Sequence, residues 1–377
     1  MAAWSPDGTK IATAAQDGLA IVWSAVDGSK LLTLKGHTFY VNAVSWSPDG
    51  AQIATASLDN TVILWSAVTG KQLFTLNGHT YDGVFAARWS PDGTKIVTAG
   101  YDSTAIIWST VSGERLHTLH GHAGLVTEVK WSPDGTKILT AGSDAQSVVW
   151  NAANGLKILA VSLHTGALTD GEWSSDGTRL LTASLDSTVL VLNALTGERL
   201  AKLTGHSSGI AKCKWSRDGS RIATAGADST VILWDAVSYT RISTIGGLPD
   251  KVEDIEWNTG STSELLVRYA NNSAGIISAV TGSVRSELQS RIKNILSISW
   301  SPNGSKIATA HRNKTALVWN ASDAQEILNL SGATGPVNGV RWSPDDSKIA
   351  AVSDDEMPIL WSAHTGKKLM NLQRHLW

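Results

Sequence analysis

The chain has 377 residues, a net charge of −2 and 42% apolar residues, so it can bury a substantial core. Acidic and basic residues are interspersed without a basic run, which argues against nucleic acid or an anionic membrane surface as the main partner. The single cysteine, Cys213, excludes an internal disulfide framework, and no apolar run approaches the roughly 18 residues of a membrane span. We therefore expect a soluble, intracellular protein without membrane insertion, located in the cytoplasm.

A block similar to Trp-Ser-Pro-Asp-Gly recurs nine times, at steps of 42 or 43 residues. A fixed period in this range indicates one supersecondary unit repeated along the chain. The units account for nearly every position, so we predict one domain over residues 1–377. The leading tryptophans of the blocks are Trp4, Trp46, Trp89, Trp131, Trp173, Trp215, Trp257, Trp300 and Trp342. The corresponding units start near residues 1, 37, 79, 122, 164, 206, 248, 291 and 333.

The second unit illustrates the expected local structure. The β-branched and aromatic run 41–46 predicts a buried strand, and Ser47-Pro48-Asp49-Gly50 has the composition of a tight turn. Residues 52–57, 61–66 and 71–76 predict three further strands, separated by turn-forming residues. Four antiparallel strands form a sheet too small to be stable alone, and packing successive sheets face to face around an axis covers both faces. The sequence therefore predicts an all-β propeller.

The unit resembles a WD40 repeat, with Gly36-His37 before the first strand and Trp65 in the third. The resemblance implies a structural tetrad of His37, Thr55, Asp59 and Trp65, in which Asp fixes the His tautomer, His donates to the Thr hydroxyl, and Thr meets the indole N–H. The same set recurs as His79, Thr98, Asp102 and Trp108, then as His122, Thr140, Asp144 and Trp150, and again as His206, Thr224, Asp228 and Trp234.

The later units depart from this pattern. Leu192 replaces the tryptophan of the fifth unit, so its His164-Thr182-Asp186 network should contribute less to stability. The seventh unit lacks both the Pro-Asp-Gly turn and the tetrad. The eighth has Arg291 and Asn313 in place of His and Asp, and the ninth has Ala333 and Ala351 in place of His and Thr. We expect the second to sixth units to be the stiffer part of the propeller.

The ends of the chain suggest how the propeller closes. The chain begins in a first strand and ends after a fourth, so every blade consists of consecutive residues and no strand is exchanged. The first unit has Thr13, Asp17 and Trp23 but no histidine, whereas His375 occupies the place of the next leading histidine. We predict that His375 completes the first tetrad, with Trp377 packing nearby, in one closed ring of nine blades. A seven-bladed ring with two units left over, and a fragment that closes with another copy, are the alternatives.

The sequence predicts no catalytic, metal or cofactor site. The Asp-His-Thr sets contain the residue types of a hydrolase triad, but they recur in every unit that keeps the tetrad pattern, whereas a catalytic site would occur once. Five of the ten histidines belong to successive units and cannot converge on one metal ion. An enzyme that uses the central channel would need a converging polar cluster, and the sequence indicates none.

Aromatic residues other than tryptophan gather in the second and third units. Of the eight Phe and Tyr residues, five are Phe39, Tyr40, Tyr81, Phe85 and Tyr101. In the WD40 family their positions open onto the rim that usually carries partner contacts, and exposed aromatic clusters are common interface anchors. The alternative for Phe85, and for Phe39, is packing beneath the loops. The resemblance implies a non-catalytic scaffold for protein partners. A structural subunit of a large multiprotein assembly and the sensor fragment of a longer signalling protein are the alternatives.

Overall fold

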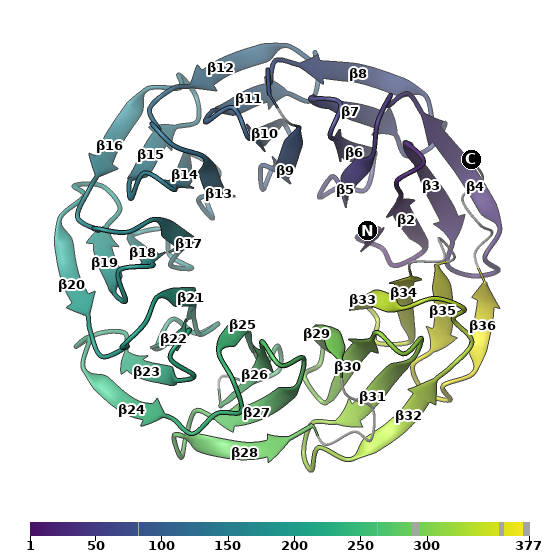
Figure 1. Cartoon of the computed structure of the whole chain (residues 1–377). Coiled ribbons are helices and arrows are strands. Elements are labelled where there is room, and N and C mark those ends of the chain that lie inside the picture. The colour runs from purple at the N-terminus through teal and green to yellow at the C-terminus, as the bar shows by residue number, and fades with distance from the viewer. Residues whose placement is uncertain (82, 262, 289–293, 354–357, 372–377) are drawn as a thin grey trace. The chain divides into compact units, whose positions relative to one another are not determined.

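The computed structural model describes residues 1–81, 83–261, 263–288, 294–353 and 358–371. Its strands form nine four-stranded sheets, and wherever the register of neighbouring strands is defined it is antiparallel. No helix occurs in the described residues, and the sheets are the nine blades of a β-propeller, as predicted (Figure 1). Packing divides the chain into two compact units, each made of several blades. The prediction of a single domain over residues 1–377 stays a prediction.

The first unit comprises Met1–Thr75, Asn258–Ser278 and Val284–Trp377. Blade one holds β1 (Ala2–Trp4), β2 (Lys10–Ala14), β3 (Leu19–Ser24) and β4 (Lys30–Lys35), and blade two holds β5 (Val41–Trp46), β6 (Gln52–Ser57), β7 (Thr61–Ser66) and β8 (Gln72–Asn77). Blade eight holds β29 (Ile295–Trp300), β30 (Lys306–His311), β31 (Ala316–Asn320) and β32 (Glu326–Leu330), and blade nine holds β33 (Val337–Trp342), β34 (Lys348–Ser353), β35 (Ile359–Ser362) and β36 (Lys368–Asn371).

The second unit comprises Leu76–Trp257 and Ala279–Ser283. Blade three holds β9 (Val84–Trp89), β10 (Lys95–Gly100), β11 (Ala105–Ser109) and β12 (Arg115–Leu119), and blade four holds β13 (Val126–Trp131), β14 (Lys137–Gly142), β15 (Ser147–Asn151) and β16 (Lys157–Val161). Blade five holds β17 (Leu168–Trp173), β18 (Arg179–Ser184), β19 (Val189–Asn193) and β20 (Arg199–Leu203), and blade six holds β21 (Ile210–Trp215), β22 (Arg221–Gly226), β23 (Val231–Asp235) and β24 (Arg241–Ile245). The seventh sheet is β25 (Val252–Trp257), β26 (Glu264–Tyr269), β27 (Ala274–Ser278) and β28 (Ser283–Glu287), of which β26 and β27 belong to the first unit.

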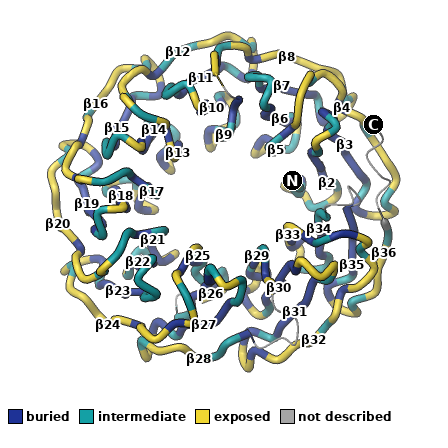
Figure 2. The backbone as a smooth tube through the Cα atoms, in the orientation of Figure 1, coloured by how far each residue is buried: buried dark blue, intermediate teal, exposed yellow. Residues whose placement is uncertain are grey.

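Burial follows the order of strands within each blade. The second and third strands are almost entirely buried, as in β6 and β7, whereas the fourth strand is largely exposed, as in β8 (Figure 2). Tryptophan and aliphatic side chains of adjacent blades form shared cores, such as the one that joins Val22 of blade one to Val44 and Trp65 of blade two. Most of the apolar area is therefore buried between blades, which explains why a single blade could not be stable alone.

The turn after the first strand is built as its composition predicts. In blade two, the Ser47 hydroxyl donates to Asp49 at 2.5 Å, and the Gly50 N–H donates to the Ser47 carbonyl at 2.9 Å. Gly50 has a φ of 71°, a left-handed conformation that glycine adopts without strain. The proline of one such turn packs on the glycine of the next, since a side-chain carbon added at Gly50 would lie 3.5 Å from Pro6 Cδ. This contact registers blade two against blade one.

Candidate functional site

The tetrad residues of blade two lie in one continuous hydrogen-bonded chain. His37 Nδ1 lies 2.8 Å from Asp59 Oδ2, His37 Nε2 lies 2.8 Å from Thr55 Oγ1, and the Trp65 indole donates to Thr55 Oγ1 at 2.8 Å. With Nδ1–H donating to Asp59, a neutral ring leaves Nε2 as an acceptor, so the Thr55 hydroxyl donates to histidine. For a neutral ring, this direction is the reverse of the one expected from the sequence, in which histidine donates. All four side chains are thus engaged with each other inside the blade.

The remaining tetrads repeat this geometry. The distance from His Nε2 to Thr Oγ1 is 2.8 Å at His79 and His122 and 2.9 Å at His206. The indole donates to the threonine at 2.9, 2.9 and 3.1 Å in the sets that end in Trp108, Trp150 and Trp234. One geometry recurs in four blades, and each threonine hydroxyl is engaged by the tryptophan of its own blade. These sets therefore stabilise the individual blades and leave no free nucleophile.

The tetrad carboxylates are held in the charged form. Burial favours protonation of Asp186, but hydrogen bonds from the Thr188 hydroxyl, the Thr165 N–H and His164 outweigh it and lower the pKa of Asp186 to about 2. The same balance keeps the pKa of Asp59 well below its ordinary value. Each aspartate therefore remains an acceptor for its histidine at neutral pH.

Blade eight retains half of a tetrad through His311, which the repeat pattern did not predict. Asn313 occupies the expected aspartate position and accepts from Thr315, while Arg291 lies outside the described residues. His311, at the end of β30, lies with Nε2 2.7 Å from Thr309 Oγ1, which also accepts from the Trp319 indole at 2.9 Å. A histidine two residues after the threonine thus replaces the one from the preceding loop. The signal in the sequence is His311 itself, at a position that is Ser or Gly in blades two to six.

Blades one and nine keep the tryptophan but change its partners. In blade one the Trp23 indole donates to Thr13 Oγ1 at 2.8 Å, and Asp17 accepts from the Leu19 N–H. His375, predicted to complete this set, lies outside the described residues, as does Trp377. In blade nine Ala351 removes the hydroxyl, and the Trp361 indole donates instead to the Ser331 carbonyl at 3.1 Å. The indole N–H is satisfied in both blades, which follows from the cost of burying a lone donor.

The five aromatic residues predicted as a binding surface belong to two separate units. In the first unit, Phe39 and Tyr40 stack with ring centroids 4.5 Å apart and are 50% and 38% exposed. In the second unit, Tyr81 and Tyr101 are 67% and 39% exposed. Phe85 is only partly exposed because it packs against the core beside Tyr101, with ring centroids 5.4 Å apart. The alternative of packing therefore applies to Phe85, while the other four present aromatic surface to solvent.

Exposed leucines accompany the tyrosines in the second unit. Leu125 and Leu163 precede the first strands of blades four and five, and Leu185 precedes the tetrad aspartate of blade five. All three are exposed, at 43%, 46% and 59%. Leu185 holds the same place in its turn as Tyr101, so the repeat alignment could have revealed it. Blades three to five thus expose large apolar side chains in the loops before the first strand or in the turn before the third.

A buried charge network ties three first strands of the second unit together. The Asp170 side chain on β17 is fully buried, with Lys130 Nζ of β13 at 3.5 Å and Lys212 Nζ of β21 at 3.9 Å. The Cys213 N–H also donates to Asp170, at 3.3 Å. An enzyme would need a converging polar cluster of this kind, but the Asp170 carboxylate is enclosed, is paired with two lysines and accepts from the Cys213 N–H. The cluster therefore stabilises neighbouring blades.

The neighbouring groups support the same interpretation. Burial raises the pKa of the Cys213 thiol well above its ordinary value, so Cys213 is not a reactive nucleophile. Burial also raises the pKa of Glu172, against the opposing charges of Lys214 and Lys130. Among the residues that the structure describes, no group of three or more His, Cys, Asp or Glu side chains could hold a metal ion.

Comparisons with known proteins agree with this architecture. The profile of the family described as "WD domain, G-beta repeat" matches residues 1–24, 28–66, 70–109, 113–151, 156–193, 197–235, 282–320 and 324–362. The chain therefore belongs to the WD40-repeat family. Residues 236–281, which contain most of the seventh repeat, fall between two matched segments, in keeping with the missing tetrad.

Two solved structures show the same fold at low sequence identity. The crystal structure of the C-terminal WD40 domain of Sif2 is 21% identical, with a TM-score of 0.68, and the match covers 84% of this chain and 94% of that domain. The computationally designed Ika8 protein is 20% identical, with a TM-score of 0.70, and the match covers 88% of this chain and 99% of the designed one. A search of curated proteins found no significant match.

Proposed function

We propose that the protein is a non-catalytic scaffold that binds protein partners through the loops before its first strands. WD40 propellers generally mediate protein interactions, and the observation that carries the proposal is the exposure of aromatic side chains in each unit, Phe39 and Tyr40 in the first and Tyr81 and Tyr101 in the second. Exposed tyrosines supply large contact area at a small cost in side-chain entropy, which makes them frequent interface anchors. Their loops follow or flank the buried tetrads, so a stiff blade supports each anchor.

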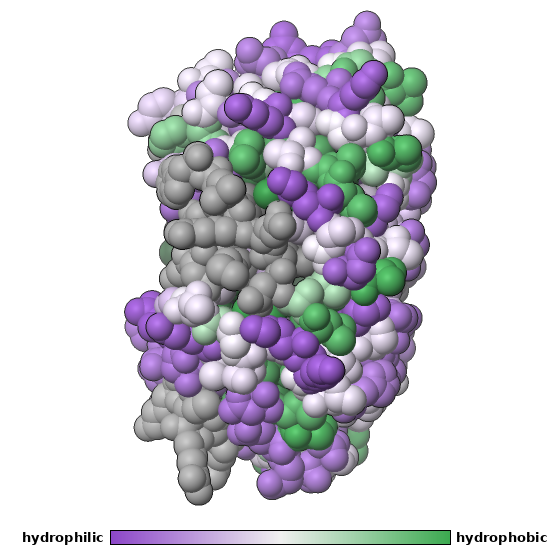
Figure 3. Space-filling model, turned by 90° about the vertical axis from the view of Figure 1, so that its right-hand side faces the viewer, coloured by the Kyte–Doolittle hydropathy of each residue, from purple (hydrophilic) through white to green (hydrophobic). Residues whose placement is uncertain are grey.

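The distribution of exposed apolar residues favours the loops before the first strands over the exposed fourth strands as the binding surface. The fourth strands also expose aliphatic side chains, such as Leu31, Leu73 and Leu369. On the side seen in Figure 3, however, apolar side chains outside the grey region alternate with hydrophilic ones. Scattered aliphatic side chains are normal for a protein surface, whereas paired aromatic rings open to solvent are less common.

The absence of catalysis and the intracellular location are parts of the same proposal. The repeated Asp-His-Thr sets and the enclosed Asp170 cluster both have a structural explanation, which leaves no catalytic assignment to make. Within the described residues, no helix is long and apolar enough to cross a membrane.

Native affinity capture with quantitative mass spectrometry tests the proposal. A scaffold recovers a set of protein partners in variable proportions. Recovery of one assembly at fixed stoichiometry would identify a structural subunit instead, and covalently attached upstream sequence would identify the sensor portion of a longer chain. Recovery of the protein alone, under crosslinking that preserves weak complexes, would contradict the proposal.

A further inference from the structure

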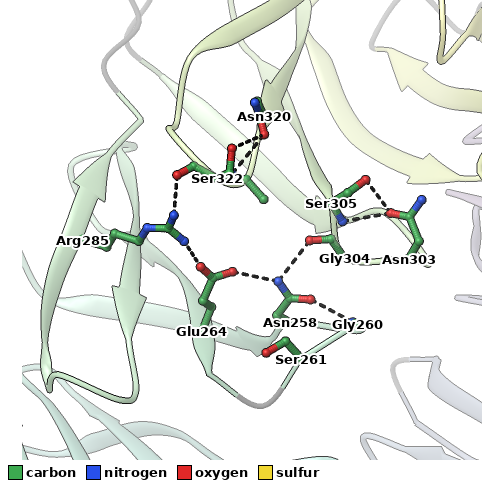
Figure 4. Close-up of a pocket in the computed structure, with 11 residues that line it drawn as sticks. Asn258, Gly260, Ser261, Glu264, Arg285, Asn303, Gly304, Ser305, Asn320 and Ser322 are labelled. Carbon is green, nitrogen blue, oxygen red and sulfur yellow. Dashed lines mark hydrogen bonds and ion pairs between the residues drawn. The ribbon is translucent and has the colours of Figure 1, made fainter.

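A pocket of about 310 Å³ opens in the first unit where the turn after β25 meets two turns of blade eight (Figure 4). At comparable places the turn proline fills the space, as beside Gly8, where an added side-chain carbon would lie 3.3 Å from Pro344 Cδ. The seventh repeat has Asn258-Thr259-Gly260-Ser261 at this turn, without proline. The pocket is therefore a local departure from the repeat, at the low end of the size range of ligand sites.

A second substitution changes the charge of the same place. Where the second strand begins, Arg179, Arg221 and Lys306 each donate to the carbonyl of a turn in the next blade, at Ala236, Ala279 and Ala363. The seventh repeat has Glu264 at this position, and a carboxylate cannot donate the bond that Arg or Lys makes in the other blades. Arg285 of the outer strand β28 takes over, because its guanidinium donates to the Ser322 carbonyl and pairs with Glu264.

The floor of the pocket is already satisfied by its own hydrogen bonds. Asn258 Nδ2 donates to Glu264 at 2.9 Å and to the Gly304 carbonyl at 3.0 Å, which uses both of its hydrogens, and its Oδ1 accepts from the Gly260 N–H. The hydroxyls of Ser305 and Ser322 donate to Asn303 and Asn320. These bonds fix the walls of the pocket.

Arg285 is the charged donor of the pocket. A guanidinium carries five N–H groups, and two of the groups of Arg285 are engaged by Glu264 and Ser322. Its side chain is 36% exposed, and no other acceptor engages it among the described residues. A guanidinium anchored on two sides and open on a third is preorganised for the planar, bidentate geometry of a carboxylate.

We propose that this pocket binds a singly charged carboxylate, held by Arg285, on a small organic acid or on an acidic side chain. Glu264 and Arg285 together leave the pocket without net charge. Attraction to Arg285 and repulsion from Glu264 both grow in proportion to the ligand's charge, so a second charge on phosphate gains little here, while it adds to the cost of desolvation. The flat carboxylate also matches the planar guanidinium better than tetrahedral phosphate does. The hydroxyl and amide groups at the rim suit the neutral polar atoms next to such a carboxylate.

Ligand-observed NMR titration tests the site with four probes: N-acetylglycine, the peptide Ac-Ala-Glu-Ala-NH2, its neutral counterpart Ac-Ala-Gln-Ala-NH2, and inorganic phosphate. We expect saturable binding of one or both carboxylates, and which of the two binds distinguishes a free acid from an acidic side chain. The glutamine peptide and phosphate should bind at least about tenfold more weakly. Absence of saturable carboxylate binding, or equal binding of the neutral peptide or of phosphate, would overturn the proposal.

Two substitutions with opposite expected effects separate recognition from folding. Arg285→Gln should weaken carboxylate binding at least about tenfold, whereas Glu264→Gln should strengthen it about threefold or more, because the repulsion disappears while an acceptor for Arg285 remains. Arg241→Gln, an exposed arginine on the outer strand of blade six, is the matched control and should change nothing. If Arg285→Gln lowers the melting temperature, the carboxylate affinity of Glu264→Gln becomes the deciding measurement. A loss of affinity in Glu264→Gln would overturn the proposal.

Discussion

The indole of Trp4 donates to the main-chain carbonyl of Arg341 at 3.3 Å, which joins residues 337 positions apart in the chain. The same bond links neighbouring blades elsewhere in the first unit, from Trp46 to Ala3 at 3.1 Å and from Trp342 to Ser299 at 3.2 Å. Blades one and nine therefore meet through the ordinary contact between successive blades. Each of their sheets consists of consecutive strands, so this junction forms without strand exchange, as predicted.

Removing the Trp4 indole donor should destabilise this junction as it would any other. We expect Trp4→Phe to lower the free energy of unfolding by about 1 kcal/mol through the lost hydrogen bond. Trp131→Phe, which removes the bond to the Arg88 carbonyl within the second unit, is the matched control. Urea denaturation measures both. If Trp131→Phe lowers the free energy of unfolding by about 1 kcal/mol and Trp4→Phe leaves it unchanged, the contact between Trp4 and Arg341 does not contribute to stability.

His375 should contribute as much as a tetrad histidine if it completes the set of Thr13, Asp17 and Trp23. We expect His375→Ala to cost about 1–3 kcal/mol of unfolding free energy, similar to His37→Ala, because both would leave a buried threonine without its partner. Thermal unfolding of the two variants provides the comparison. An unchanged melting temperature in His375→Ala would refute this closure and leave Trp4 as the link that the structure supports.

Blade five should depend less on its aspartate than an intact blade, because Leu192 provides no indole for Thr182. The best comparison is Asp228 of blade six, since both aspartates accept from a threonine two residues later, Thr188 and Thr230, at 2.7 Å. Asp144 is a poorer match because Gln146 occupies that place. We expect Asp186→Ala to cost less than Asp228→Ala, within a range of about 1–3 kcal/mol for each. Equal losses in denaturant unfolding would mean that the tryptophan adds nothing to the network.

His311 should make the protein less stable in mild acid. Burial lowers the pKa of His311 to about 4, below the value near 6.5 of an unfolded chain. Between these values the unfolded state binds the additional proton, so stability is retained above pH 6.5 and falls as the pH drops toward 4. The shift corresponds to about 3 kcal/mol as an order of magnitude. In His311→Gln, which keeps a donor for Thr309, the difference in unfolding free energy between pH 7 and pH 4.5 should shrink accordingly. An identical pH dependence in both proteins would contradict the assignment.

The exposed tyrosines should matter for partner capture and not for folding. We expect Tyr40→Ala combined with Tyr81→Ala to weaken binding of captured partners by several kcal/mol, because hot-spot aromatics dominate interface energies. The melting temperature should hardly change, since both side chains are exposed. Phe85→Ala is the informative contrast, because its ring packs on the core and its loss should lower stability. Unaltered capture by the double variant would remove these residues from the proposed interface.

The sequence by itself determined the repeat, the turns and the positions of the strands. The predicted strands 41–46, 52–57 and 61–66 coincide with β5, β6 and β7, and the predicted 71–76 is displaced by one residue from β8. These features are local: Pro48 and Gly50 dictate a turn through their own backbone preferences, and β-branched runs favour strands. The tetrad spacing could be read for the same reason, since it repeats with the unit.

Only the tertiary structure decided which atoms satisfy one another where the repeat fails. His311 replaces a histidine from the preceding loop, Trp361 turns to the Ser331 carbonyl, and Arg285 performs a role that other blades give to the first residue of the second strand. Phe85 and Tyr101 are both aromatic, yet one packs and the other faces solvent. A buried donor takes whichever acceptor the packed blades bring within about 3 Å. That proximity arises between residues distant in the chain, and no local pattern encodes it.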